Sequence, residues 1–211
     1  MNFYQRCKSI KKHFDGQFSI FFDAGAGGDN QEASAIHDLM RNVSIYGFEA
    51  STPRYDALKL SYPGKIYNVM LGDQEKEYKG FLGGAKLCKV PIDNFRININ
   101  EQEAIDERIN FRETSIDCIT LDNFYKKHEL NGDVFVWADI EGSELLMLRG
   151  STWLLENKKI AGLNLEISDV SWFPSPSEVV GFLEGYGYSP IEEIFLAKGA
   201  HKDIFFSRNK K

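Results

Sequence analysis

The segment FSIFFDAGAGG, residues 18 to 28, decides the fold of this chain. Phe18 to Phe22 is apolar except for one serine, and such a run is typical of a parallel strand covered on both faces. Asp23 ends the strand, and the glycines that follow allow a sharp turn close to a ligand. Asp29 and Asn30 then offer N-cap side chains for a helix to about Arg41. This order of elements predicts a nucleotide site.

The acid before the turn indicates which nucleotide binds. A dinucleotide fingerprint requires a third glycine where this chain has Asn30, and the carboxylate of Asp23 would repel a pyrophosphate. The same carboxylate suits a cationic amine or sulfonium, and S-adenosylmethionine carries both. Glu49 follows Gly25 by 24 residues, the spacing at which a second-strand acid accepts the ribose hydroxyls. We therefore favour S-adenosylmethionine over NAD, with an ordinary tight turn as the alternative.

Composition limits the class of protein. A chain of 211 residues suits one α/β domain, residues 1 to 211, and its net charge of -6 argues against nucleic-acid binding. Its three cysteines are scattered, which indicates free thiols in a reducing cytoplasm. No apolar run approaches the ~18 residues of a membrane span, and no signal-peptide core is present. We expect a cytoplasmic protein without an integral membrane segment, and the sequence leaves a homodimer open.

Hydrophobic periodicity outlines the remaining elements. An N-terminal helix within residues 1 to 15 places Cys7, Ile10 and Phe14 on one face, which favours docking on the sheet over binding to a membrane surface. The link between strands 188 to 196 and 202 to 207 is too short for a parallel crossover, so these strands form an antiparallel hairpin. The other expected strands cover residues 44 to 49, 65 to 71, 134 to 138 and 160 to 167, and a further helix covers 177 to 186.

The middle of the chain departs from this repeat. Residues 76 to 113 are glycine-rich and then charged, and we interpret them as an insertion on the substrate side, with a disordered surface loop as the alternative. Asp73, just before this segment, is a candidate contact of the adenine or a solvated turn acid.

A second group of acids follows two buried strands. Asp139 and Glu141 come directly after residues 134 to 138, at the edge of the sheet where α/β proteins bind ligands. Glu144 is explained by the start of the next helix. Glu166 lies near the end of an apolar strand, where a buried carboxylate needs a partner or a function.

Trp172 and Phe173 lie in a loop rich in proline and serine on the same sheet edge. The two aromatic rings can stack on a sugar or base, or pack back on the fold.

These residues together resemble the FkbM-type methyltransferases. The resemblance covers roughly residues 20 to 190 and rests on a D-x-G-A turn, an F-E acid, a T-L-D helix start, a D-x-E-G-x-E block, an L-x-G and a later L-E. Here they are Asp23-Ala24-Gly25-Ala26, Phe48-Glu49, Thr120-Leu121-Asp122, Asp139-Ile140-Glu141-Gly142-Ser143-Glu144, Leu148-Arg149-Gly150 and Leu165-Glu166.

The resemblance implies a class I, Rossmann-like methyltransferase fold: a mostly parallel sheet with an antiparallel C-terminal hairpin and helices on both faces. It also implies S-adenosylmethionine as the methyl donor. The reaction it implies is O-methylation of a hydroxyl on a sugar or natural product, and we expect a sugar in a cell-surface glycan or its nucleotide-sugar precursor. The expected cofactor contacts are Asp23, Gly25, Ala26, Gly27, Glu49, Ala50, Asp73 and Asp139, and the expected substrate contacts are Glu141, Trp172 and Phe173.

One position departs from the family. FkbM-type chains commonly have a lysine two residues before the block aspartate, where this chain has Trp137. A non-catalytic S-adenosylmethionine-binding module is therefore the alternative, together with methylation of a non-sugar small molecule. For catalysis, Asp139 and Glu166 are the candidate bases because a hydroxyl is a poor nucleophile. The four histidines show no forced approach to the site. We expect no metal, although Asp139, Glu166 and Asp169 are acids that can hold Mg²⁺.

Overall fold

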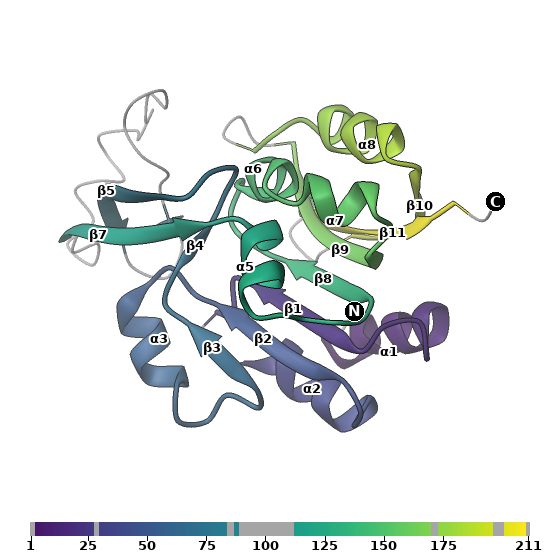
Figure 1. Cartoon of the computed structure of the whole chain (residues 1–211), viewed down its shortest axis with the longest axis horizontal. Helices are drawn as coiled ribbons and strands as arrows, with labels where there is room; N and C mark the ends of the chain where they lie inside the picture. Colours follow the sequence, from purple (N-terminus) through teal and green to yellow (C-terminus); the bar gives the residue numbers. More distant parts are fainter. Residues whose placement is uncertain are drawn as a thin grey trace.

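A seven-stranded sheet forms the centre of the structure, a computed structural model that describes residues 3–27, 30–83, 87–88, 112–169, 173–195 and 201–209 (Figure 1). Its strand order is β10-β11-β9-β8-β1-β2-β3. β11 pairs antiparallel with β9 and β10, and the other pairings are parallel. The strands are β1 Ile20–Ala24, β2 Ser44–Phe48, β3 Lys65–Tyr67, β8 Val134–Ala138, β9 Ile160–Ser168, β10 Tyr188–Phe195 and β11 His201–Arg208. The antiparallel C-terminal hairpin is thus confirmed.

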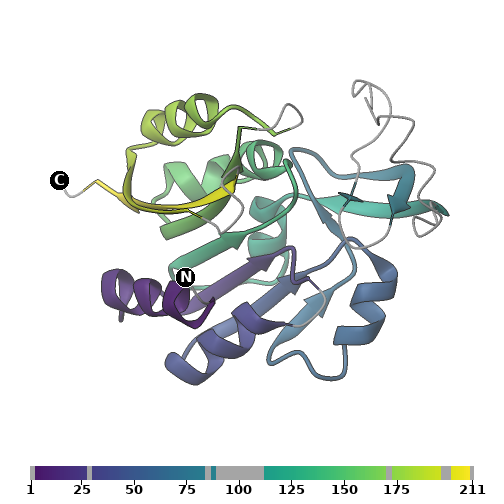
Figure 2. The same cartoon turned by 180° about the vertical axis from the view of Figure 1, so that it is seen from behind.

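Helices cover both faces of this sheet, as Figures 1 and 2 show. One apolar cluster joins residues of α1, α2 and α3 to one face, and a second joins residues of α5, α6, α7 and α8 to the other. The helices are α1 Phe3–Phe14, α2 Gln31–Leu39, α3 Thr52–Leu58, α5 Leu121–Lys127, α6 Glu144–Arg149, α7 Thr152–Glu156 and α8 Pro176–Gly185. The class I fold expected from the sequence is confirmed.

The N-terminal helix α1 docks on the sheet. Cys7, Ile10 and Phe14 are fully buried, and the Phe14 ring meets the Phe135 ring edge-on at 5.0 Å between centroids. Gly162 of β9 makes room for it, because a Cβ there would lie 2.3 Å from the Phe14 ring. α1 therefore contributes to the core, as expected.

The single strand expected over residues 65 to 71 is wrong. The chain breaks into β3 and β4 (Met70–Leu71) because the Asn68 amide donates to the carbonyls of Glu49 (2.8 Å) and Ala50 (3.3 Å). β4 joins a second sheet of order β4-β7-β5-β6, with β5 Lys76–Gly83, β6 Leu87–Cys88 and β7 Arg112–Ile119. The predicted insertion therefore begins and ends in strands, and residues 89–111 lie outside the described residues.

The end of α2 and the capping at its start also differ from expectation. α2 ends at Leu39 rather than Arg41. Asn30 occupies the N-cap position in a left-handed conformation (φ 47°) but makes no side-chain cap, because its amide oxygen accepts from the Ser34 hydroxyl instead. Asp29 lies outside the described residues. α8, in contrast, starts with a full capping box between Ser175 and Glu178.

Candidate active site

The turns after β1 and β8 touch each other at the carboxyl edge of the sheet. The Asp139 amide donates to the Ala24 carbonyl at 3.0 Å. Gly25 adopts a positive φ of 82°, and a Cβ at this position would lie 2.0 Å from the Asp139 carbonyl oxygen. Only glycine permits this approach, so the first acid-glycine turn and the acidic block are built as one unit.

Asp23 presents an unsatisfied buried carboxylate. Its Oδ2 accepts from the Tyr62 hydroxyl at 2.7 Å, whereas its Oδ1 is buried without a hydrogen-bond partner in the structure. Burial raises the pKa of Asp23 to about 7; the Tyr62 hydrogen bond opposes this shift, and the charges of Asp139 and Glu49 add to it. A buried acid with a free oxygen fits a cationic group of a ligand.

Glu49 accepts two backbone hydrogen bonds, one of them from the loop that follows β1. Its Oε2 accepts from the Gly27 amide at 3.0 Å and its Oε1 from the Ser51 amide at 2.7 Å. Each carboxylate oxygen keeps one further lone pair, so the two oxygens can still accept hydroxyl groups. Glu49 thus joins the glycine loop after β1 to the residues after β2.

Two residues expected to contact the cofactor, Ala50 and Asp73, follow Glu49 in the chain. Ala50 packs against an apolar pair of buried residues, Met70 and Cys118. Burial raises the pKa of the Cys118 thiol to about 12, and the charge of Asp73 contributes to this shift. Asp73 is therefore within electrostatic reach of the patch beneath Ala50. Ala26 is buried, and its amide donates to the Phe48 carbonyl at 3.1 Å.

Glu144 shapes the turn of the acidic block. Its Oε1 accepts from the amides of Ile140 (3.1 Å) and Gly142 (3.4 Å), and its Oε2 is buried without a hydrogen-bond partner. The chain passes through positive φ at Glu141 (54°) and Gly142 (98°). Burial raises the pKa of Glu144 to about 8. Its role in the structure is to fold the turn that carries Asp139 and Glu141.

Asp139 and Glu166 come together at the ends of β8 and β9. Burial raises the pKa of Glu166 to about 9, and the charge of Asp139 and a hydrogen bond with its carboxyl add to the shift. Asp139 is the exposed member and Glu166 the half-buried one. The structure thus brings together the two acids that the sequence nominated as bases.

Three residues that the sequence did not nominate complete this edge. His201 Nδ1 lies 3.7 Å from Glu166 Oε1, contrary to the expectation that no histidine approaches the site. Asp203 pairs with Glu166 across β11 and β9 and accepts from Arg6 Nη1 at 2.5 Å. The register of the predicted hairpin against β9 is the signal that could have found His201 and Asp203; nothing in the sequence points to Arg6.

The buried Tyr62 and the half-buried Glu32 were also missed. Burial raises the pKa of Glu32 to about 8, and the charge of Asp23 adds to it.

A comparison with protein-family models identifies the family of this chain. The model of the methyltransferase FkbM domain matches residues 23–190. The chain belongs to the FkbM methyltransferase family. Its methyl donor is therefore S-adenosylmethionine, and the unpartnered Asp23 oxygen and the glycine cradle beside Glu49 fit that cofactor. No curated protein sequence matches the chain significantly.

Several solved structures with similar folds are methyltransferases of low sequence identity to this chain. They include TrmK of M. capricolum in complex with S-adenosylhomocysteine (TM-score 0.52, 12% identity, 100% of this chain and 70% of that chain). Aeropyrum pernix fibrillarin with S-adenosylmethionine has a TM-score of 0.51 at 14% identity over 96% and 73% of the two chains. The methyltransferase domain of bacterial CtHen1-C has a TM-score of 0.50 at 14% identity over 98% of each. These likenesses show the class I fold.

Two motifs of the FkbM domain have structural roles here. The Asp122 carboxylate accepts from the amides of Trp153 (2.8 Å) and Leu154 (3.0 Å), so it satisfies the start of α7. Gly150 packs so closely that a Cβ would lie 1.9 Å from the Gly72 carbonyl oxygen. The T-L-D motif therefore fixes the start of α7. The L-x-G motif allows the end of α6 to pack closely against the turn after β4.

The aromatic residues singled out in the sequence have these positions in the structure. Trp137, at the usual lysine position, is buried against Phe205, and the Arg6 guanidinium lies 5.2 Å above its ring centroid. Phe173 is buried edge-on against His201, with 5.5 Å between centroids. Trp172 lies outside the described residues.

The described residues hold neither a cluster suited to a metal ion nor a helix that could span a membrane. No three or more of their His, Cys, Asp and Glu side chains are grouped as a metal site. Over the same part of the chain, every helix is too short or too polar to cross a membrane.

Proposed function

We propose that this FkbM-family enzyme transfers a methyl group to a hydroxyl of a sugar, in a cell-surface glycan or its nucleotide-sugar precursor. The observation that carries the proposal is the acid pair at the carboxyl edge, with Asp139 exposed and Glu166 half-buried beside it. A neutral hydroxyl needs a base to take its proton, and a positioned base is worth ~10²–10⁴-fold in rate.

The two acids differ in exposure, and this difference assigns their roles. With its pKa raised to about 9, Glu166 keeps its proton at neutral pH and donates it in the hydrogen bond with Asp139. Asp139 then stays an acceptor, fixed in orientation and open to the acceptor hydroxyl. His201 is a further neighbour of Glu166, with its Nδ1 3.7 Å from Glu166 Oε1.

S-adenosylmethionine supplies the electrophilic methyl group on a cationic sulfur. Asp23 and its free Oδ1 attract the cationic end of the cofactor, and Glu49 accepts its ribose hydroxyls. Asp139 would receive the proton that the acceptor hydroxyl loses when its oxygen takes the methyl group from the bound cofactor. Much of the barrier reduction comes from alignment, worth up to ~7–11 kcal/mol in favourable cases.

The acceptor class follows from charge and family. A net charge of -6 and the acids Asp139 and Glu141 along the open edge oppose a polyanionic substrate. A neutral sugar carries several hydroxyls and no charge to repel. The resemblance to FkbM-type enzymes favours the same class.

The test is incubation with labelled S-adenosylmethionine and a panel of nucleotide sugars, methyl glycosides, tRNA and a protein mixture, followed by mass analysis. We expect label in a sugar as an O-methyl ether. Faster methylation of RNA or protein than of any sugar would refute the proposed acceptor class. Cofactor binding without turnover on any class would instead favour a non-catalytic binding module.

A further inference from the structure

Arg6 of α1 reaches the acids of the site across strand β9. Its Nη1 donates to Asp203 Oδ2 of β11 at 2.5 Å, and its guanidinium lies 5.2 Å from the ring centroid of Trp137 of β8. Because β9 lies between β8 and β11 in the sheet, these two contacts span β9. The Arg6 side chain is 17% exposed and that of Asp203 is 3% exposed. The charges of this ion pair therefore act on their neighbours more strongly than charges at the surface.

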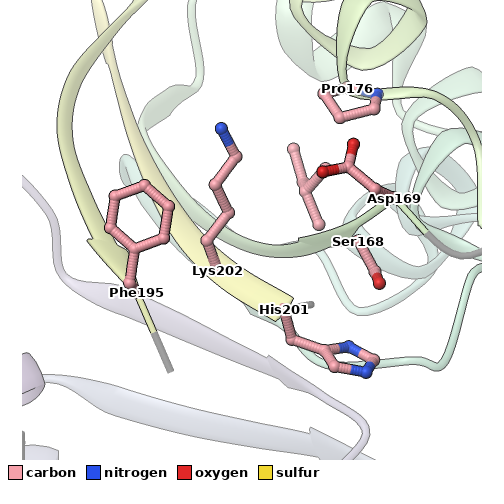
Figure 3. A pocket seen from close by; sticks show the side chains of 7 residues that line it. Ser168, Asp169, Pro176, Phe195, His201 and Lys202 are labelled. Carbon is pink, nitrogen blue, oxygen red and sulfur yellow. The ribbon is translucent and has the colours of Figure 1, made fainter. Parts of the chain in front are cut away.

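Strand alternation places Asp203, Glu166 and His201 on the face of the sheet that α1 covers. Asp203 pairs with Glu166 across β11 and β9, so the two side chains project from the same face. His201 is two residues before Asp203 in β11 and shares this face, whereas Lys202 points to the opposite one. Figure 3 shows the His201 ring directed away from the side chains of Lys202 and Phe195. The acids at this edge therefore lie beneath α1.

Asp203 connects Arg6 to the acid pair of the site. Burial raises the pKa of Asp203, and the charge of Arg6 and its hydrogen bond oppose this rise. Burial also raises the pKa of Glu166 to about 9. The charges of Asp139, Glu141 and Asp203 add to that shift, and Glu166 shares a hydrogen bond with Asp139. Arg6 thus influences the acid pair through one carboxylate, that of Asp203.

Further charged and titratable groups surround this contact. Besides Arg6, Asp203 and Glu166, they are Glu32 of α2, Asp139 and Glu141 after β8, and His201 of β11. The charges of Glu32 and Asp139 favour the charged form of Arg6. Arg6 is therefore a cation held among carboxylates, and its removal would leave the buried Asp203 carboxylate without its countercharge.

We infer that Arg6 is a positioning residue of the methyl transfer. Placed over the Trp137 ring, it holds the Asp203 carboxylate in its charged form. The charged Asp203 favours the protonated form of Glu166, which donates its hydrogen bond to Asp139. This inference rests on the proposed function, because it concerns the acids that take the proton there. It gives the N-terminal helix, which precedes the family match at residues 23–190, a part in the reaction.

The experiment follows the Glu166 carboxyl by carbon-13 NMR in protein labelled at its glutamate carboxyl groups, with Glu166→Gln assigning the resonance. Its titration is compared in wild type, Arg6→Met, Arg6→Lys and Asp203→Asn. The matched control is His13→Ala, which removes another contact of α1 with the hairpin, from His13 Nε2 to Glu192 Oε2 at 3.0 Å. His13 lies about two helical turns from Arg6.

We expect the midpoint of the Glu166 titration to fall by about one pH unit in Asp203→Asn, because a neighbouring negative charge is lost. The midpoint should fall in Arg6→Met as well, because Asp203 then takes up a proton. Arg6→Lys and His13→Ala should stay close to wild type. An unchanged or higher midpoint in Arg6→Met would overturn the inference. If Arg6→Met does not fold, Arg6→Met/Asp203→Asn removes both charges and should show the lower midpoint instead.

Activity gives a second readout. On a sugar that wild type methylates, Arg6→Met should lower kcat roughly tenfold, a fraction of the ~10²–10⁴-fold value of a positioned base, with little change in the KM for S-adenosylmethionine. Arg6→Lys should recover most of this loss. An equal loss of kcat in His13→Ala would show that Arg6 only docks α1, against the inference. Failure of the proposed function is a separate result: wild type methylates no sugar, and the NMR comparison still decides the role of Arg6.

Discussion

At the scale of single residues, the carboxylates of the site do different work because their surroundings differ. Asp23 is buried with one oxygen unused, Glu49 is held by two backbone amides, and Glu144 folds a turn. Asp139 is exposed, and it lies beside Glu166, whose pKa burial raises to about 9. In the proposed mechanism the same functional group attracts a cation, accepts hydroxyls, supports a loop or takes a proton according to its burial and partners.

Glu49 is the residue on which cofactor affinity should depend most directly. Glu49→Ala should weaken S-adenosylmethionine binding by the ~1.5–3 kcal/mol of a hydrogen bond to a charged group, measured by calorimetry. Asp56→Ala, which removes an exposed acid of α3, is the control and should bind normally. Wild-type affinity in Glu49→Ala would remove the ribose assignment.

Asp139 tests the chemistry without disturbing the core. Asp139→Asn should lower kcat by ~10²-fold or more while the thermal transition stays close to wild type, because the side chain is exposed. Asp133→Asn alters the acid at the opposite end of β8, which pairs with Arg208, and should leave kcat unchanged. A fully active or unfolded Asp139→Asn would assign this aspartate to the fold rather than to the reaction.

Glu144 makes the stability of the protein depend on pH. Its pKa is about 8 in the folded state against an ordinary 4.5, so between these values the folded state holds a proton that the unfolded state has lost. Raising the pH through this window therefore lowers the free energy of unfolding. Glu144→Gln should match wild type at pH 5 and exceed it at pH 8 by at least about 1 kcal/mol in urea unfolding.

The matched control for this prediction is Glu156→Gln, at an exposed position of α7, which should follow wild type at both pH values. Equal stability of Glu144→Gln and wild type at pH 8 would show that the buried carboxyl does not couple folding to pH.

At the scale of elements, the site depends on how closely the β1 and β8 turns approach. Gly25→Ala introduces a Cβ 2.0 Å from the Asp139 carbonyl oxygen in a residue with φ of 82°. It should destabilise the fold by at least ~1–3 kcal/mol and abolish S-adenosylmethionine binding, as checked by urea unfolding and calorimetry. In Gly181→Ala an added Cβ within α8 meets nothing within 4 Å, so this control should gain roughly 0.5–1 kcal/mol. Normal cofactor binding by Gly25→Ala would contradict the interlocked turns.

At the scale of the whole molecule, the net charge of -6 governs which acceptors can approach. With saturating cofactor, the kcat/KM for a neutral methyl glycoside should change little between about 50 and 200 mM salt, because no phosphate contacts release counterions. Initial rates across this range provide the measurement, with binding of a tRNA as the comparison. A steep loss of glycoside activity with salt would point to a polyanionic acceptor.

The sequence by itself determined the parallel sheet, the C-terminal hairpin, the docking of α1 and the chemistry of the first turn. These features depend on local patterns: apolar runs, glycine positions and the length of a link between strands. Asp23, Glu49 and Asp139 were nominated because each lies at or just after the end of a strand that the pattern identifies, and the carboxyl ends of parallel strands share one edge.

Only the tertiary structure decided which residues meet at that edge. Arg6 reaches Asp203 from the other end of the chain, Tyr62 reaches Asp23 from a turn, and His201 reaches Glu166 through an antiparallel register. The break at Asn68 and the exposure of Phe195 are likewise long-range results of packing. Contacts between residues far apart in sequence depend on the register of whole strands and on helix packing, and no local pattern encodes these.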